Sequence, residues 1–216
     1  MCDSVKVLCE NSSEQLEIPI GTSLLQLLDK VKVEGKSPVL AAYVNNRLKE
    51  LNYRIFKPAM VRFIDISHFE GYRVYQRTIS FILHKAVRDL YGERKFYIRH
   101  SLGRGLYCEF EERNPISDEE LVALRERMQH IISAAYPIHR LRMPTSEVEH
   151  IYKEFGFEDK VALLNTRPRL YSDMHRMDDI VGYFYGALAA DTSYIHLFDL
   201  RRYYNGFYVA LPTRTD

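Results

Sequence analysis

The sequence predicts an α+β protein made of two small modules in series, residues 1–66 and residues 67–216. A chain of 216 residues is long enough for two small domains, and hydrophobic residues make up 46% of it, which is sufficient for two cores. The first module has the order strand, strand, helix, strand, strand, which predicts a small sheet packed against one helix. The second module mixes amphipathic helices with hairpins, which predicts a two-layer α/β arrangement.

The first module opens with two strands and a helix. Residues 5–9 and 15–18 carry alternating or β-branched residues with turn-forming residues between them, so we expect two neighbouring strands. Ser23 is a good helix N-cap, and the apolar stripe that follows it extends from Leu24 to Val31. The pattern therefore predicts a helix over this stretch.

Two further strands complete the first module. Residues 39–44 form an apolar run that is typical of a buried strand. Asn45 and Asn46 follow it, and asparagine tolerates the positive φ that a tight hairpin turn requires. Residues 61–66 are expected to form the last strand, and the junction with the second module is expected near residues 67–71.

The second module starts with a helix and a hairpin. Apolar residues between Ile79 and Leu90 recur with helical spacing, and the helix is expected to end near Gly92. Residues 96–100 and 106–110 then predict a hairpin.

The remainder of the second module contains two helix starts and a strand-rich end. Ser117 with Glu120 and Ser146 with Glu149 both have capping-box spacing, and each precedes an apolar stripe. From Val161 onward we expect strands and loops, which end in two strands over residues 194–200 and 206–211.

Composition and charge exclude several classes of protein. The formal net charge is +1, so no global field draws the chain to nucleic acid or to a membrane. Cys2, Cys9 and Cys108 are an odd number without C-x-x-C spacing, which disfavours a disulfide framework or a cysteine zinc ribbon. The first ten residues lack signal-peptide features, and no apolar run is long enough to span a bilayer. We expect a cytoplasmic protein without a membrane partner.

The sequence lacks the common nucleotide-binding and hydrolase motifs. It has no G-x-x-x-x-G-K-[ST] phosphate loop, no G-x-G-x-x-G after a strand, no H-E-x-x-H and no G-x-S-x-G. Residues 102–105 contain a G-x-G, but they sit within the expected hairpin and are interpreted as a turn. We therefore predict no catalytic residue, no metal and no cofactor in this chain.

Two groups of polar residues remain as candidates. Among eight histidines, His84, His100 and His175 could join Asp179 around a metal, but scattered hydrogen-bonding histidines are the commoner explanation. Near the end of the chain arginine and tyrosine interleave, as in surfaces that stack bases and neutralise phosphates, although a solvated surface has the same composition. The residues are Arg167, Arg169, Tyr171, Arg176, Tyr183, Tyr185, Arg201, Arg202, Tyr203 and Tyr204.

Several fragments resemble the front end of threonyl-tRNA synthetase. Residues 21–25 and 39–51 look like a TGS domain, a β-grasp module. Further on, five stretches look like the second additional domain that threonyl- and alanyl-tRNA synthetases share, and they occur in the family's order. These stretches are residues 86–91, 105–109, 116–121, 159–161 and 171–174. The resemblance thus implies a TGS domain over residues 1–66 and an editing-domain-like module over residues 67–216.

In that family the second domain hydrolyses mischarged tRNA with an H-x-x-x-H and a C-x-x-x-H that hold a metal. The resemblance matches the first pair to Arg77 and Phe81. Neither can replace a histidine ligand, because phenylalanine has no lone pair and arginine does not lose its proton. The second pair is matched to His175 and Asp179.

Other residues of the family's editing pocket are retained. Lys160 and Asp173 match residues that line it, and Tyr107 is added as a further candidate. The resemblance therefore implies a pocket without its metal chemistry, able to bind a nucleotide or the end of a tRNA or other RNA. The alternatives are a relict editing hydrolase of the same type and a plain interaction or oligomerisation module.

The same two modules also resemble the front of bacterial TGS-containing nucleoside (uridine) kinases. Residues 194–200 and 206–208 are similar to that family. The resemblance implies a downstream kinase domain as partner, which would use ATP and Mg²⁺, and a regulatory role for the present chain.

Overall fold

The computed structural model of the protein describes residues 3–35, 37–92, 94–112, 115–166 and 169–213. Cys2 and Arg167, named above, lie outside these ranges. The chain is an α+β protein, as the sequence predicts, and it divides into two compact units. Unit 1 comprises residues 1–136 and 187–216, and unit 2 comprises residues 137–186.

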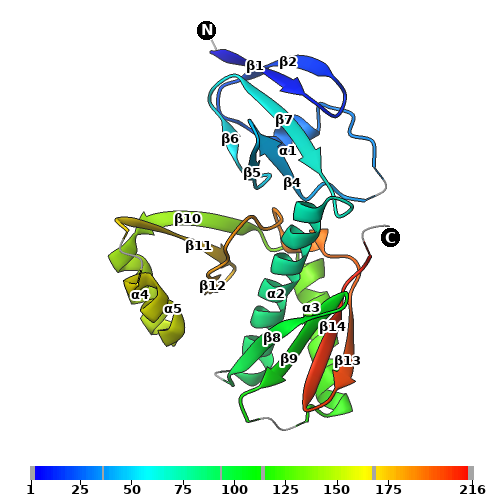
Figure 1. Ribbon diagram of the computed structural model, residues 1–216, viewed down its shortest axis with the longest axis vertical. Coiled ribbons are helices and arrows are strands. Elements are labelled where there is room, and N and C mark those ends of the chain that lie inside the picture. The colour runs from blue at the N-terminus through cyan, green and yellow to red at the C-terminus, as the bar shows by residue number, and fades with distance from the viewer. Residues whose placement is uncertain (1–2, 36, 93, 113–114, 167–168, 214–216) are drawn as a thin grey trace. The chain divides into compact units, whose positions relative to one another are not determined.

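A five-stranded sheet opens unit 1, with the strand order β2-β1-β7-β4-β5 (Figure 1). Strands β1 and β7 are parallel and the other neighbours are antiparallel. A short β3-β6 ladder and helix α1 accompany the sheet. The elements are β1 (Ser4–Cys9), β2 (Glu14–Pro19), β3 (Thr22–Ser23), α1 (Leu24–Leu28), β4 (Ala41–Val44), β5 (Arg47–Lys49), β6 (Arg54–Ile55) and β7 (Ala59–Ile64).

Local chemistry explains most of this region. Asn45 and Asn46 have φ values of 47° and 63°, so the predicted tight turn is confirmed. Ser23 caps α1 in a capping box with Gln26. The predicted extent of α1 is wrong, because the helix ends at Leu28 and the backbone then tightens, with Val31 donating to the Leu28 carbonyl. Val31 is nevertheless buried in the same core.

The rest of unit 1 is a four-stranded sheet with two long helices. The strand order is β13-β14-β9-β8, all antiparallel. Rings on the helix side of the sheet meet rings of α2, because Tyr91 contacts Phe110 and His84 contacts Phe96. Figure 1 shows α2 and α3 behind this sheet. The elements are α2 (Phe69–Tyr91), β8 (Phe96–Leu102), β9 (Gly105–Phe110), α3 (Asp118–Ser133), the 3-10 turn η1 (Thr192–Tyr194), β13 (Asp199–Tyr203) and β14 (Gly206–Ala210).

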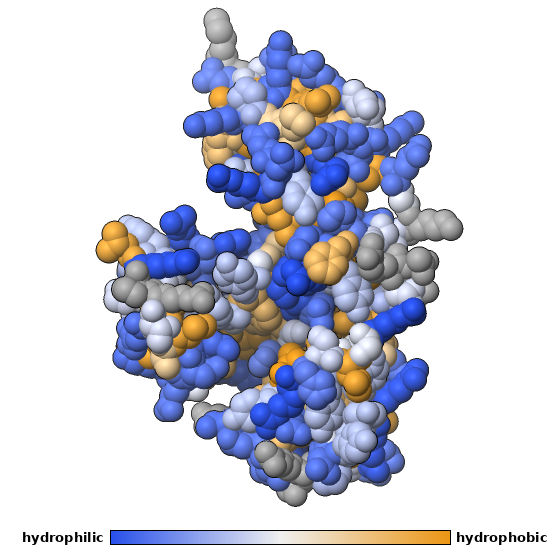
Figure 2. Space-filling view, in the orientation of Figure 1, coloured by the Kyte–Doolittle hydropathy of each residue, from blue (hydrophilic) through white to orange (hydrophobic). Residues whose placement is uncertain are grey.

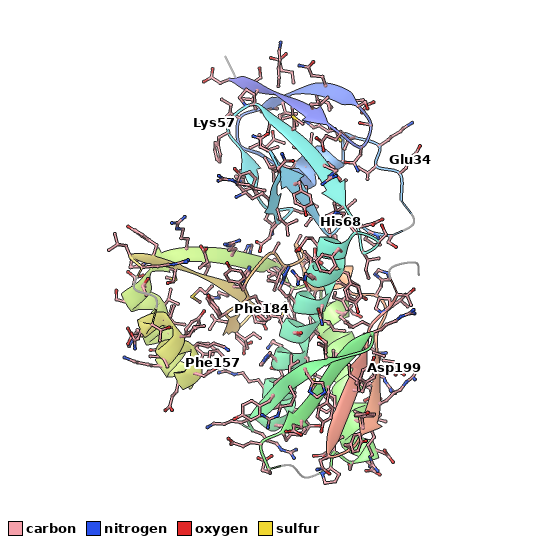
Figure 3. The ribbon with its side chains drawn as sticks, viewed as in Figure 1. Glu34, Lys57, His68, Phe157, Phe184 and Asp199 are labelled. Carbon is pink, nitrogen blue, oxygen red and sulfur yellow. The ribbon has the colours of Figure 1, made fainter. Side chains whose placement is uncertain are left out.

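Residues 65–71 form the junction between the two sheets of unit 1. Asp65 accepts from the Ser67 backbone and His68 caps the start of α2 (Figure 3). Gly71 packs so closely that a β-carbon there would lie 1.8 Å from the Asp65 carbonyl oxygen. The helix α2 therefore begins directly against the last residues of the N-terminal sheet.

One predicted strand of unit 1 is wrong. Residues 194–200 do not form one strand, because Tyr194 ends η1 and β13 begins only at Asp199. Tyr75 explains the difference: its hydroxyl donates to the Leu197 carbonyl and accepts from the Leu197 amide, so this backbone is satisfied outside a sheet.

Unit 2 is a three-stranded antiparallel sheet with two helices. Its strand order is β10-β11-β12, and its core joins Val148 and Tyr152 of α4 to Met174 of β11. The elements are β10 (Ile138–Pro144), α4 (Thr145–Glu154), α5 (Glu158–Asn165), β11 (Tyr171–Met177) and β12 (Ile180–Gly182). None of the helices in the described ranges is long and apolar enough to cross a membrane.

Two sequence-based expectations fail in unit 2. The segment after Val161 does not consist of strands and loops only, because α5 extends to Asn165, and Glu158 and Asp159 in its first turn favour a helix start. The capping box of Ser146 with Glu149 is also absent, since α4 already begins at Thr145. The Thr145 hydroxyl instead bonds the Arg169 carbonyl.

Candidate functional site

The residues that the resemblance assigns to the pocket fall in both units. Arg77 and Phe81 lie on α2 and Tyr107 on β9, all in unit 1. The remaining four, Lys160, Asp173, His175 and Asp179, lie in unit 2.

Arg77 is a half-buried arginine that hydrogen-bonds the backbone at Ala187, where the chain returns from unit 2 to unit 1. Its Nε donates to the Ala187 carbonyl at 3.1 Å, and its Nη2 lies 3.8 Å from the Glu70 carboxylate. Burial lowers the pKa of the guanidinium, and the carboxylates of Glu70 and Glu50 oppose this effect. Nη2 is buried and has no hydrogen-bond partner among the described residues. The guanidinium thus supplies a positive charge inside unit 1, at the position where the resemblance implies a lost metal ligand.

The return segment, residues 187–197, carries much of this local structure, whereas the sequence marks only its end, residues 194–197, as part of an expected strand. The Glu50 carboxylate accepts from the Leu188 amide at 3.1 Å, and the Thr78 hydroxyl accepts from the Ala189 amide at 3.0 Å. Leu188 is itself fully buried. The return segment is therefore fixed to unit 1 by hydrogen bonds between its backbone and Arg77, Glu50 and Thr78.

Phe81, one turn further along α2, is 1% exposed and belongs to the core of unit 1. A second cation follows it on the same helix, because the Lys85 side chain is only 4% exposed and its Nζ lies 2.9 Å from Asp89. The other oxygen of Asp89 accepts from Arg127 of α3 at 2.7 Å. Helix α2 thus carries two partly or fully buried cations, and one carboxylate links the second to α3.

Replacing Asp89 by alanine is expected to lower the free energy of unfolding by about 2 kcal/mol. The cost lies between that of an exposed ion pair and that of a fully buried one, since only Lys85 is deeply buried. Urea denaturation measures the loss. Glu10→Ala, which removes the exposed pair with Arg62, is the matched control and should change stability by less than about 0.5 kcal/mol. Equal effects of the two variants would contradict the assignment.

Tyr107 lies on the side of the four-stranded sheet that faces away from α2 and α3. Its hydroxyl donates to Glu109 at 2.9 Å, and its ring contacts those of His100 and Tyr203. Burial, followed by the hydrogen bond to Glu109, raises the pKa of the phenol. Tyr107 is therefore a neutral member of an aromatic cluster.

In unit 2 the four assigned residues have different surroundings. Asp173 pairs with Arg140 at 2.8 Å, and Lys160 pairs with its neighbour Asp159 at 2.9 Å. His175 is buried and its ring meets Phe184, which follows β12 (Figure 3). Asp179 is exposed in the turn between β11 and β12. Asp173 and His175 are two residues apart on β11 and so share one face of that strand.

The residues of the alternative metal site, which would use histidines, also fall in both units. His84 lies on α2 and His100 on β8, in unit 1, whereas His175 and Asp179 lie in unit 2. Within the described ranges, no three His, Cys, Asp or Glu side chains gather closely enough to hold a metal ion.

Comparison with known proteins finds sequence similarity to threonine--tRNA ligases. No protein-family model matches it. The threonine--tRNA ligase of Syntrophomonas wolfei is 27% identical over 154 residues, which is 71% of this chain and 24% of that protein. The corresponding ligase of Methylococcus capsulatus is 25% identical over 199 residues, 92% of this chain and 31% of that protein. A threonine--tRNA ligase of Geobacter sp. (strain M21) is 23% identical over 186 residues, 86% of this chain and 29% of that protein.

The chain therefore spans about a quarter to a third of the length of the curated relatives it matches. The sequence-based resemblance to part of threonyl-tRNA synthetase is supported at this level.

Proposed function

We propose that this chain is a non-catalytic RNA-binding module derived from a tRNA synthetase, which binds the end of a tRNA or another RNA without hydrolysing it. The similarity to threonine--tRNA ligases over most of the chain supports an RNA ligand. The residues assigned to the former editing pocket are Arg77, Phe81, Tyr107, Lys160, Asp173, His175 and Asp179. The resemblance carries this assignment.

One observation supports the loss of hydrolysis. The Arg77 guanidinium donates a hydrogen bond to the Ala187 carbonyl, and Phe81 is buried in the core. A metal that activates water needs ligands with an available lone pair, and neither side chain offers one. A fixed guanidinium can instead supply positive charge toward an anionic ligand.

Two measurements on the purified chain test the proposal. A fluorescently labelled tRNA that accepts threonine should bind with a Kd of about 10 μM or tighter at physiological salt. The same tRNA, charged with a wrong amino acid, should lose that amino acid at the rate seen without protein.

Each negative outcome has a separate meaning. Deacylation above the background rate would overturn the non-catalytic assignment and favour the editing hydrolase. Absence of binding to the tRNA, to unpaired RNA and to nucleotides would overturn the proposal as a whole.

The proposal extends to the domain organisation of this chain. Residues 1–66 would be a TGS domain, which the parallel pairing of β1 with β7 around a single helix supports. Residues 67–216 would be the second additional domain, with unit 2 inserted in it. The buried free thiols of Cys9 and Cys108 agree with a reducing cytoplasm.

The kinase context stays a prediction. If the chain regulates a nucleoside (uridine) kinase, ATP and Mg²⁺ would bind in that downstream domain and not here. An immunoblot of the source cells checks this: a band much larger than 25.5 kDa is expected, and a band of that size would remove the kinase link.

A further inference from the structure

The outer side of the four-stranded sheet carries a continuous group of aromatic rings. We call the side chains of His100, Tyr107, Tyr203 and Tyr208 the aromatic face. One comes from each strand, β8, β9, β13 and β14. The register places His100 opposite Tyr107 and Tyr107 opposite Tyr208, while Tyr203 pairs with Gly206. These residues therefore lie on one side of the sheet.

The rings touch one another across the strands. The centroids of Tyr107 and His100 are 5.4 Å apart, and those of Tyr107 and Tyr203 are 5.8 Å apart. Tyr203 also meets Tyr204 at 4.7 Å and Tyr208 at 6.5 Å. Tyr203 is 38% exposed and Tyr204 is 78% exposed. This cluster is thus partly open to solvent, unlike Phe110 of β9 and Phe207 of β14, which meet on the opposite side of the sheet and are fully buried.

Two glycines leave space beside the sheet for the rings of the aromatic face. A β-carbon on Gly105 would lie 2.4 Å from Cζ of Tyr208, so the tyrosine ring lies over this position on the neighbouring strand. Gly206 likewise places no side chain between Tyr203 and the strand β9. Tyr203 meets Tyr107 and Tyr204 edge to face, with interplanar angles of 72° and 83°. A base can stack on the ring face that each tyrosine leaves open to solvent.

The charges around this surface favour an anionic partner. Arg201 is 71% exposed at its side chain, and Arg104 is exposed in the β8-β9 turn. Two carboxylates near this surface are paired with arginines: Glu109 accepts from Arg99, and Asp199 pairs with Arg201 and Arg125. The hydrogen bond from Arg201 lowers the pKa of Asp199. Figure 2 shows pale and dark blue residues side by side over this part of unit 1, consistent with tyrosines among arginines.

We propose that the aromatic face, with Tyr204 beside it, is a stacking surface for two to four unpaired nucleotides of single-stranded RNA. This inference rests on the proposed function and names the surface through which the RNA is held. Bases stack on the tyrosine rings, and the guanidinium groups of Arg104 and Arg201 meet the phosphates. Duplex RNA does not fit, because its bases are already stacked on one another.

The test measures binding of a fluorescein-labelled oligoribonucleotide of eight unpaired residues by fluorescence anisotropy. Tyr203→Ala and Tyr204→Ala should each weaken binding about tenfold, whereas Tyr203→Phe should retain it, because the ring and not the hydroxyl stacks. Tyr53→Ala is the matched control, since Tyr53 is 39% exposed outside this sheet, and it should bind as the wild type does. Circular dichroism verifies that each variant is folded.

Two further arms test the chemistry. Arg104→Gln should reduce the slope of log Kd against log salt by about 0.7, the value for one phosphate contact on a single strand. A duplex RNA of the same length should bind at least about tenfold more weakly than the single strand.

The outcomes separate this inference from the proposed function. If the wild type binds tRNA and single-stranded RNA but Tyr203→Ala and Tyr204→Ala bind equally well, the aromatic face is not the binding surface and the proposed function stands. If the wild type binds no RNA, both the inference and the proposed function are overturned. If the tyrosine variants lose only self-association in sedimentation, the surface is a protein interface and the inference is overturned.

Discussion

Replacing Thr192 by valine, which has the same branched shape, is expected to lower the free energy of unfolding by about 3 kcal/mol. The Thr192 side chain is fully buried, and its hydroxyl donates to the Ile131 carbonyl at 2.8 Å and accepts from the Tyr136 amide at 3.0 Å. Valine leaves both backbone groups buried without this partner, and each such group costs about 1–3 kcal/mol. Urea denaturation measures the loss.

Two companion variants separate hydrogen bonding from packing. Thr192→Ser keeps the hydroxyl and should recover most of the stability that valine loses. Thr166→Val removes an exposed hydroxyl that donates to the Leu163 carbonyl at 2.8 Å, and it should cost less than about 0.5 kcal/mol. Equal losses in the serine and valine variants would show that packing, not hydrogen bonding, is responsible.

Replacing Gly71 by alanine is expected to cost about 3 kcal/mol or more. The added methyl group would lie 1.8 Å from the carbonyl oxygen and 2.7 Å from the carbonyl carbon of Asp65, and backbone atoms cannot move aside as a flexible side chain can. Either the first turn of α2 unwinds or the link from β7 shifts. Thermal unfolding followed by circular dichroism reports the loss.

The control for this variant is Gly156→Ala. Gly156 follows α4 with a φ of +70°, and no atom lies within 4 Å of the position of its β-carbon. Its amide donates to the Lys153 carbonyl, and the Phe157 amide donates to the Tyr152 carbonyl, which is the pattern of a left-handed helix end. Alanine there has only the strain of the left-handed backbone, about 1 kcal/mol. If Gly71→Ala were no more harmful than Gly156→Ala, the close packing of α2 against Asp65 would be refuted.

Elements with strong local chemistry could be predicted from the sequence. The turn at Asn45-Asn46, the capping box of Ser117 with Glu120 and the end of α2 at Gly92 each depend on residues close in sequence. All three are found as predicted.

Elements set by distant contacts could not be predicted. Residues 194–197 look like part of a strand, but a hydroxyl from Tyr75, more than a hundred residues earlier, satisfies the amide and carbonyl of Leu197. Helix α5 was missed because its apolar periodicity is weak and its core contact is supplied mainly by Leu164.

The candidate site was predictable only in part. Residue chemistry alone shows that Arg77 and Phe81 cannot hold a metal as histidines do. That Arg77 binds the Ala187 carbonyl required the structure, because no local pattern connects these two residues. Of the aromatic face, only Tyr203 belongs to the arginine–tyrosine mixture that the sequence shows, and it is the strand register that brings Tyr107 beside it.

The bonds between Tyr136 and Thr192 have a further consequence for residues 137–186. The chain leaves unit 1 at Tyr136 and comes back to a residue that is hydrogen-bonded to it through both backbone and hydroxyl. Unit 1 therefore restrains this stretch as a covalent cross-link would, by removing extended conformations from its unfolded ensemble. A cross-link closing a loop of this size is worth roughly 4 kcal/mol. Residues 137–186 excised as a separate peptide should thus be markedly less stable than the same residues within the chain.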